Sequence, residues 1–262
     1  PVGEHALAGA LRFLGRGDFR DVPDGDRILR RYLDAALQTV FTSRRLMSRF
    51  KFTCVVAPHG MYVPEGLICE VARQNDVRVA AWSLAYRRAT AVFSHGTTYH
   101  HTLMSEPVST WEDMTWTPEI ENEIVDYLNS RRYGTRDWIR FTQNPQEDIG
   151  SIGRALGADL SKPTIGLLTN VIWDAQLIYP NNAFGSMLEW ILVSIRYFAK
   201  RPDLQLVIRV HPGELLANTR ARQTETQEIQ REFPTLPDNV FVIPPESSIG
   251  TYALMCQCNA VI

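Results

Sequence analysis

Seven short apolar runs, separated by polar loops and by stretches with helical periodicity, constrain the fold of this sequence more than any other feature. The runs cover residues 52–57, 77–82, 91–94, 164–169, 204–210, 240–243 and 260–262. Short apolar runs bounded by proline, glycine or polar residues are typical of buried strands. Strands that alternate with helices predict β-α-β units and parallel sheets. We therefore expect an α/β fold.

The order of the runs predicts two Rossmann-like lobes and a connector. Residues 1–104 hold three runs, and residues 162–262 hold four in the order expected of a doubly wound sheet. Residues 105–161 carry Trp111, Trp116 and Trp138 among many charges, which predicts a helical connector that packs between the lobes. The chain starts at Pro1 and stops as its last strand begins. We therefore expect a fragment of a longer protein, with its second lobe truncated at the C-terminus.

Charge and cysteine usage narrow the class of protein. The 262 residues carry 27 Lys and Arg against 29 Asp and Glu, a net charge of −2, which argues against nucleic-acid binding by bulk electrostatics. The four cysteines, Cys54, Cys69, Cys256 and Cys258, lack zinc-finger spacing and predict free thiols in a reducing compartment. We therefore expect a cytoplasmic protein.

One predicted helix, residues 26–47, is basic through Arg30, Arg31, Arg44 and Arg45, with Arg49 just after it. A solvated face explains such charges, and the alternative is a peripheral contact with anionic lipid or an anionic acceptor at the inner face of the cytoplasmic membrane. No apolar run approaches the roughly 18 residues of a membrane-spanning helix.

Polar side chains follow the predicted strands at their carboxyl ends, where open parallel sheets bind ligands. We expect them to line a cleft shared by the two lobes. In the first lobe they are His59, Glu65, His95 and Thr97; in the second they are Asn170, Asp174, Arg209, His211, Glu214, Ser247 and Ser248.

The run from Arg209 to Glu214 is the sharpest local signal. Pro212 ends the strand and Gly213 permits a tight turn. His211 is then placed to donate to a phosphate oxygen, and the alternative is a structural loop histidine. Glu214 is placed to accept from ribose hydroxyls, and the alternative is capping of a first helical turn.

Ser247 and Ser248 open a predicted helix that runs through Cys256. Free backbone N–H groups at a helix start bind anions, so a nucleotide phosphate is one interpretation and an ordinary serine N-cap is the other.

In the first lobe the same pattern, a predicted strand followed by His-Gly and a loop, occurs twice, at His59-Gly60 and at His95-Gly96. A histidine there could accept a proton from an acceptor hydroxyl, as could Glu65 or Asp174. No carboxylate lies at a metal-ligand spacing among the histidines, which argues against a metal site. The sequence contains no GxGxxG, GxxxxGK[ST] or GxSxG motif, which weighs against dehydrogenase, P-loop and serine-hydrolase functions.

Four segments together resemble the capsule polysaccharide biosynthesis proteins, a family that includes Kdo-transferring enzymes. They are His59-Gly60 with residues 64–66, the loop at 169–174, the run at 208–214 and the turn at 247–252. The resemblance implies a GT-B architecture, with an acceptor-side lobe at 1–104 and a nucleotide-sugar lobe at 162–262. It implies that His211 and the Ser247–Ser248 turn lie near the donor's phosphates, and that no metal is obligatory.

The resemblance therefore predicts a glycosyltransferase that moves a sugar from a nucleotide sugar to a capsular or lipopolysaccharide glycan, or to a lipid-linked acceptor. The proton acceptor would be His59, Glu65 or Asp174, and Arg209 and His211 would offset charge on the leaving phosphate. On the acceptor side we expect His95 and Thr97. Two alternatives stay open: a sugar-nucleotide epimerase of the same architecture, and a non-catalytic glycan-assembly module.

Overall fold

The computed structural model describes residues 1–262 except 106, 142–143, 175–181 and 216–220. The chain is a mixed α/β protein that divides into two compact units. Among the described residues, the first unit comprises 1–11 and 19–139, and the second comprises 12–18, 140–174 and 182–262. Helix α1 (Val2–Leu14) begins in the first unit, and its last turn belongs to the second.

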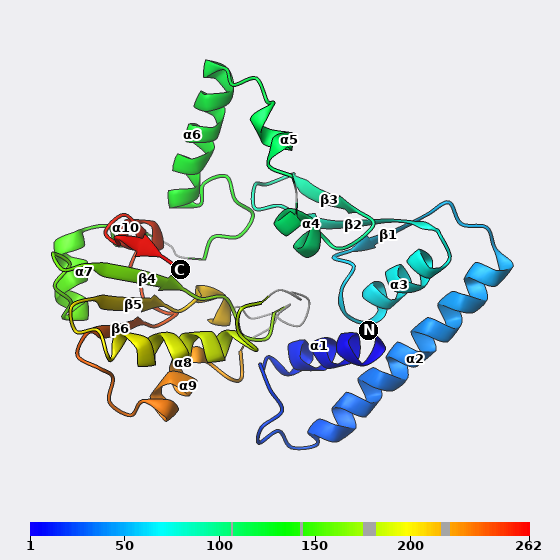
Figure 1. Ribbon diagram of the computed structural model, residues 1–262, viewed down its shortest axis with the longest axis horizontal. Helices are drawn as coiled ribbons and strands as arrows, with labels where there is room; N and C mark the ends of the chain where they lie inside the picture. The colour runs from blue at the N-terminus through cyan, green and yellow to red at the C-terminus, as the bar shows by residue number, and fades with distance from the viewer. Residues whose placement is uncertain (106, 142–143, 175–181, 216–220) are drawn as a thin grey trace. The chain divides into compact units, whose positions relative to one another are not determined.

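The first unit contains a three-stranded sheet with helices against one face (Figure 1). Its strands are β1 (Cys54–Pro58), β2 (Arg78–Leu84) and β3 (Ala91–His95), and its larger helices include α2 (Gly25–Arg49) and α3 (Leu67–Gln74). Ala57 of β1 and Val79 of β2 are buried against Cys69 of α3. Ala6 of α1 and Ala36 of α2 meet in a second cluster. The small side chains allow the helices to approach each other closely.

The prediction of a parallel sheet in residues 1–104 is wrong for the third strand. β1 and β2 are parallel, but β3 runs antiparallel to β2, with Ala80 opposite His95 and Leu84 opposite Ala91. Residues 85–90 form the whole connection between these strands. A parallel crossover needs about a dozen residues or more, so a connection this short returns the chain in the opposite direction.

In the described chain, β3 is followed by helices α4 (Tyr99–Ser105), α5 (Ser109–Glu112) and α6 (Pro118–Tyr133). Helix α6 is capped by Thr117, whose hydroxyl accepts from the N–H of Ile120, and it ends at Gly134 with φ of 61°. The guanidinium of Arg131 lies over the Tyr86 ring at 4.2 Å, which fixes the base of α6 to the turn between β2 and β3.

The second unit is built on a four-stranded parallel sheet of order β6-β5-β4-β7. The strands are β4 (Thr164–Leu168), β5 (Gln205–Arg209), β6 (Val240–Ile243) and β7 (Ala260–Val261). The helices are α7 (Ile149–Leu156), α8 (Met187–Phe198), α9 (Glu225–Glu232) and α10 (Thr251–Met255). Parallel pairing throughout this sheet confirms the prediction for residues 162–262.

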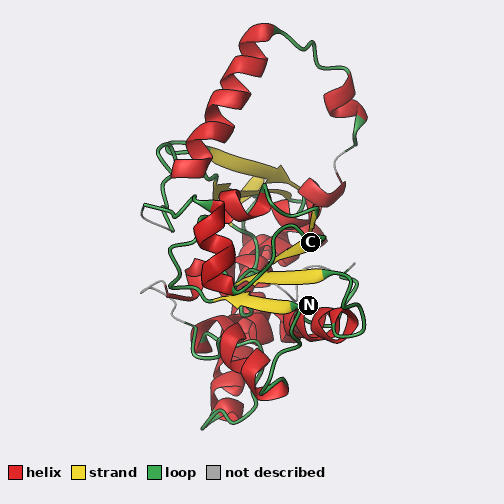
Figure 2. Cartoon of the chain, turned by 90° about the vertical axis from the view of Figure 1, so that its left-hand side faces the viewer, coloured by secondary structure: helices red, strands yellow, loops and turns green. Residues whose placement is uncertain are grey.

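Helices cover both faces of this sheet (Figure 2). Successive strand residues point to opposite faces, so Ile208 packs with Ile195 of α8, whereas Val207 packs with Ile152 of α7 and Leu254 of α10. Burial of each such side chain contributes about 1.5–3 kcal/mol. The two-sided packing confirms the predicted doubly wound arrangement.

The strand order reverses next to β4, because the chain adds β5 and β6 on one side of it and β7 on the other. Open parallel sheets bind ligands in the crevice outside the carboxyl ends of strands at such a reversal. The loop that follows β4, residues 169–174, therefore occupies the position where a ligand site is expected.

In the part of the chain that the structure describes, no helix combines the length and the apolar character needed to cross a bilayer. The arginines of α2 are exposed, as expected of a solvated face; they are Arg27, Arg30, Arg31, Arg44, Arg45 and Arg49. The four cysteines are free thiols.

Candidate functional site

The ends of β4 and β5 are joined by Thr169. Its hydroxyl accepts a 3.0 Å hydrogen bond from the N–H of His211, and its own N–H donates to the carbonyl of Arg209 at 3.2 Å. Thr169 is buried, whereas the next residue, Asn170, is exposed and accepts from the N–H of Val171 through Oδ1. These bonds hold the two predicted site residues Asn170 and His211 just after adjacent strands, at the carboxyl edge of the second sheet.

His211 is held in one protonation form by its own turn. Its Nδ1 accepts from the N–H of Gly213 at 2.9 Å, so the neutral ring carries its proton on Nε2 and presents a donor. The Phe141 ring lies edge-on at 4.9 Å. Burial lowers the pKa of His211, the positive charge of Arg209 lowers it further, and Asp174 acts in the opposite sense. At neutral pH the ring is therefore an uncharged hydrogen-bond donor.

Arg209 is only 2% exposed, and its terminal nitrogens bond to backbone carbonyls. Nη1 donates to Pro244 at 2.7 Å and to Val210 at 3.2 Å, and Nη2 donates to Ser247 at 3.2 Å. Burial lowers the pKa of Arg209. The side chain thus ties the loop after β6 to the end of β5. This arrangement differs from the expected direct contact with a leaving phosphate, because the guanidinium is buried and its terminal nitrogens bond to backbone carbonyls.

Ser247 and Ser248 precede helix α10 rather than starting it, which corrects the predicted helix boundary. The helix begins at Thr251, with Gly250 in an extended conformation before it. Gly250 donates to the carbonyl of Gln146 and Gln146 donates to that of Ser248, which holds residues 248–250 extended. The Ser247 hydroxyl accepts from the N–H of Ile249 at 3.3 Å, and Ser248 is exposed.

Glu214 faces the interior of the second unit. It is 1% exposed, and its Oε1 accepts from the backbone N–H of Glu225 at 2.9 Å. It therefore caps α9, rather than the turn that contains it, and this position differs from the expected contact with ribose hydroxyls. Glu225 is fully buried, and the Thr169 side chain is the polar group whose hydrogen-bonding interaction with its carboxyl partly offsets the effect of burial on its pKa. Burial raises the pKa of both carboxyl groups.

Asp174 forms an ion pair with Arg12, which the sequence pattern does not indicate. Nη1 of Arg12 lies 3.4 Å from Oδ1 of Asp174, and its guanidinium carbon lies 5.7 Å from the centre of the Trp173 ring. Arg12 and Asp174 are 162 positions apart in the chain. No local pattern links residues so far apart, so only the tertiary structure could identify this pair.

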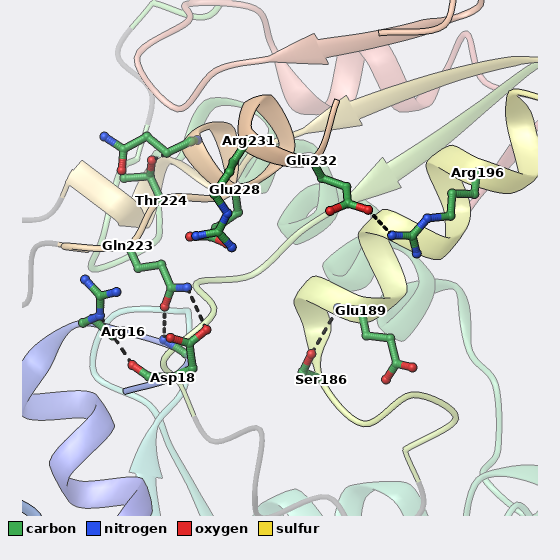
Figure 3. Close-up of polar contacts among 12 residues, drawn as sticks. Arg16, Asp18, Ser186, Glu189, Arg196, Gln223, Thr224, Glu228, Arg231 and Glu232 are labelled. Atoms are coloured by element: carbon green, nitrogen blue, oxygen red, sulfur yellow. Dashed lines mark hydrogen bonds and ion pairs between the residues drawn. The ribbon is translucent and has the colours of Figure 1, made fainter. Parts of the chain in front are cut away.

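The segment that carries Arg12, residues 12–18, is anchored on the second unit (Figure 3). Gln223 accepts from the N–H of Gly17 at 2.9 Å and donates to Oδ2 of Asp18 at 3.0 Å. The carbonyl of Gly15 accepts from the N–H of Arg222 at 2.9 Å. These hydrogen bonds define the position of the turn after α1.

The first-unit candidates lie on two different loops. His59 and Gly60 follow β1 with φ of 55° and 67°, and the N–H of His59 donates to the carbonyl of Trp82. Glu65 is half-buried in the helical turn Tyr62–Gly66. His95 is exposed and lies opposite Ala80, near the amino end of β2. The expectation that His59 and His95 share one sheet edge is therefore wrong, because β3 is antiparallel.

The chain after β3 nevertheless returns to His59. The Ser94 hydroxyl donates to the carbonyl of Thr97, and the Thr97 hydroxyl lies 3.0 Å from Nδ1 of His101. The ring of Tyr99 lies 6.3 Å from that of His59. Thr97 therefore lies just before a short polar helix, α4, next to the His59 loop.

Two further findings bear on the nature of the site. Among the described residues, no three His, Cys, Asp or Glu side chains gather as metal ligands. No family model, no curated protein and no solved structure matches this chain.

Proposed function

We propose that this chain is the catalytic region of a GT-B-type glycosyltransferase, related to the capsule polysaccharide biosynthesis proteins. It would transfer a sugar from a nucleotide sugar to a capsular or lipopolysaccharide glycan, or to a lipid-linked acceptor, at the inner face of the cytoplasmic membrane. The observation that carries the proposal is the placement of His211, as a neutral donor, beside Asn170 at the carboxyl edge of a doubly wound parallel sheet.

The chemistry requires a site that stabilises a departing phosphate. As the bond between the anomeric carbon and the phosphate oxygen breaks, negative charge develops on the nucleoside diphosphate or monophosphate. The Nε2–H of His211 can donate to that oxygen, and a preformed donor of this kind lowers the barrier without reorganisation. Asn170, Ser247 and Ser248 are the neighbouring candidates for donor contacts. Arg209 and Glu214 would contribute indirectly, because their buried side chains position the loops that carry these groups.

The acceptor hydroxyl must lose its proton as the new glycosidic bond forms. His59 and Glu65 of the first unit are proposed to accept this proton, with Asp174 as the third candidate. His95 and Thr97 are proposed as acceptor-side residues. Asp174 is placed third because its carboxylate is paired with Arg12. The proposal needs no metal, since protein donors would stabilise the leaving group.

Donor hydrolysis is the most direct test, because a transferase slowly passes its sugar to water when no acceptor is present. The chain would be incubated with CMP-, UDP-, GDP- and TDP-linked sugars, and free nucleotide would be quantified by chromatography. We expect release of free nucleotide from one nucleotide class and loss of that release in His211→Ala. Interconversion of the nucleotide sugar without release would instead identify an epimerase. Binding without either reaction would indicate a non-catalytic module, and both outcomes would refute the proposal.

A further inference from the structure

A phosphate site at the edge of the second sheet needs an accessible positive charge, and Arg209, the one cation among the residues predicted from sequence, is buried. The terminal nitrogens of Arg209 are used by the carbonyls of Val210, Pro244 and Ser247 inside the protein. His211 is neutral, because burial and the charge of Arg209 lower its pKa. One uncharged donor binds a doubly charged diphosphate only weakly, so a further cation is required.

Arg12 is in the right place to supply that charge. Its guanidinium contacts Asp174 at 3.4 Å and lies over the Trp173 ring at 5.7 Å, and both of these residues belong to the loop after β4. This loop also lies against the His211 turn, since a Cβ on Gly213 would lie 2.6 Å from Nδ1 of His211 and 3.5 Å from the Val171 side chain, and the N–H of Asp174 donates to the carbonyl of Val171. Arg12 and His211 therefore both lie beside this loop, at the carboxyl ends of β4 and β5.

The position of Arg12 is fixed by its surroundings while its head group stays accessible. Hydrogen bonds from Gln223 and Arg222 anchor the segment after Arg12. The side chains of Arg12 and Asp174 are 39% and 35% exposed. A half-exposed ion pair contributes little to stability, whereas a planar guanidinium binds phosphate oxygens with two parallel hydrogen bonds. A phosphate can therefore replace the carboxylate as the partner of Arg12.

We propose that Arg12 is the cation that binds the diphosphate of the ligand at this site, and that Asp174 holds the guanidinium when no anion is bound. The identity of the ligand as a sugar nucleotide rests on the proposed function, but the chemistry recognised here is that of a diphosphate. In this account Asp174 competes with the ligand, and binding transfers Arg12 from an internal carboxylate to an external phosphate.

A purely structural ion pair makes a different prediction. If Arg12 and Asp174 only tie the end of α1 to the loop after β4, removal of either partner breaks the same contact. Both substitutions would then change ligand affinity in the same direction, or leave it unchanged. If Asp174 competes with a phosphate, the two substitutions act in opposite directions. The sign of the two effects therefore separates the accounts.

The test is calorimetric titration with inorganic pyrophosphate at low ionic strength, together with a thermal unfolding curve for each variant. Arg12→Gln should bind pyrophosphate at least about tenfold more weakly, since one charge-assisted contact is lost. Asp174→Asn should bind it about three- to tenfold more tightly, since the competing charge is gone. The exposed pair of Arg201 and Asp203 in the same unit provides matched controls, and Arg201→Gln and Asp203→Asn should stay within about twofold of wild type.

Arg12→Lys is a conservative control for a folding defect, because lysine keeps the positive charge of Arg12 but lacks the planar guanidinium. It should fall between wild type and Arg12→Gln. The inference is overturned if wild type binds no pyrophosphate, or if Arg12→Gln and Asp174→Asn change affinity in the same direction or not at all.

The outcome is distinguishable from the outcome for the proposed function. Opposite effects on pyrophosphate binding without consumption of any nucleotide sugar would support the anion site and refute the glycosyltransferase. Turnover of a nucleotide sugar with unchanged pyrophosphate affinity in Arg12→Gln would support the glycosyltransferase and refute the role of Arg12 in anion binding.

Discussion

The backbone N–H of Glu225 donates a 2.9 Å hydrogen bond to Oε1 of Glu214, and so joins two buried carboxyl groups at the start of α9. Among the described residues, the second oxygen of Glu214 has no hydrogen-bond partner, and the Thr169 side chain is the polar group that interacts with the carboxyl of Glu225. Two adjacent carboxyl groups in such surroundings retain protons more strongly than exposed ones, since ionisation places charge in a poorly solvated interior.

The first prediction concerns the pH dependence of stability. Burial raises the folded-state pKa of Glu225 above its ordinary value of 4.5. The folded state therefore holds this proton more tightly than the unfolded state, and stability is lost as pH rises above 4.5 toward the folded pKa. Glu225→Gln replaces the titratable carboxyl group by a neutral amide. The variant should match wild type near pH 4.5 and be more stable at about pH 8, and the difference should grow as pH rises between these values.

Urea unfolding at several pH values measures this difference. Glu232→Gln, which removes an exposed carboxyl from the same helix, is the control and should show no such trend. A wild type whose stability relative to Glu225→Gln is constant from about pH 4.5 to about pH 8 would contradict the assignment of a buried, proton-holding carboxyl.

The second prediction concerns Arg209. Arg209→Met should destabilise the second unit by about 3 kcal/mol or more, because it leaves the carbonyls of Val210, Pro244 and Ser247 without their donors. Arg209→Lys should rescue it only in part, since one ammonium cannot reproduce the fork of the guanidinium. Urea unfolding is the measurement, with exposed Arg201→Met as the control within about 0.5 kcal/mol. Equal stability of Arg209→Met and wild type would contradict the conclusion that Arg209 holds the loop after β6 to the end of β5.

The third prediction concerns catalysis by His211. His211→Ala should lower donor turnover by at least about 100-fold in a variant that still unfolds cooperatively, as expected when a donor to the leaving group is removed. The pKa of His211 is lowered below its ordinary value of 6.5, so the imidazole stays neutral from about pH 7 to about pH 8. Turnover that depends on it should be flat over this range. Unchanged turnover in the folded variant would remove His211 from the site.

The extent to which the sequence predicts this structure differs between strands and polar contacts. The apolar runs coincide with the seven strands found in the described part of the chain, because each is a short segment bounded by turn residues. The parallel second sheet also follows from the pattern. The direction of β3 does not, since alternation of strands and helices favours a parallel strand while the short connection at residues 85–90 requires an antiparallel one.

The candidate site is predictable only in part. Asn170 and His211 are found because they follow apolar strands directly, and the structure places them on adjacent strands. The burial of Arg209 is not evident from sequence, since its partners Pro244 and Ser247 lie 35 and 38 positions away. In the sequence, Glu225 is one of several polar residues of a helix that the pattern predicts to be solvated. The residues around Arg12 do not indicate that it contacts a site. Long-range polar contacts of this kind depend on tertiary packing rather than on periodicity.

The fourth prediction concerns the His59 loop. Gly60 has φ of 67°, and a Cβ there would lie 3.2 Å from that of Ala81. Gly96 has φ of 83°, and no atom of the described residues lies within 4 Å of where its Cβ would stand. Both alanine substitutions impose a left-handed conformation that costs about 1 kcal/mol, but only Gly60→Ala adds crowding. Thermal unfolding should therefore rank Gly60→Ala below Gly96→Ala, and the reverse order would contradict the loop geometry.

The central claim is that the carboxyl edge of the second sheet binds a sugar nucleotide. Hydrogen–deuterium exchange of the wild-type chain, with and without the nucleotide sugar that gives the largest thermal shift, tests it most directly. We predict slower exchange in residues 169–174 and 209–213 when the ligand is bound. Protection confined to residues 54–98, or no protection at all at saturating ligand, would contradict the claim.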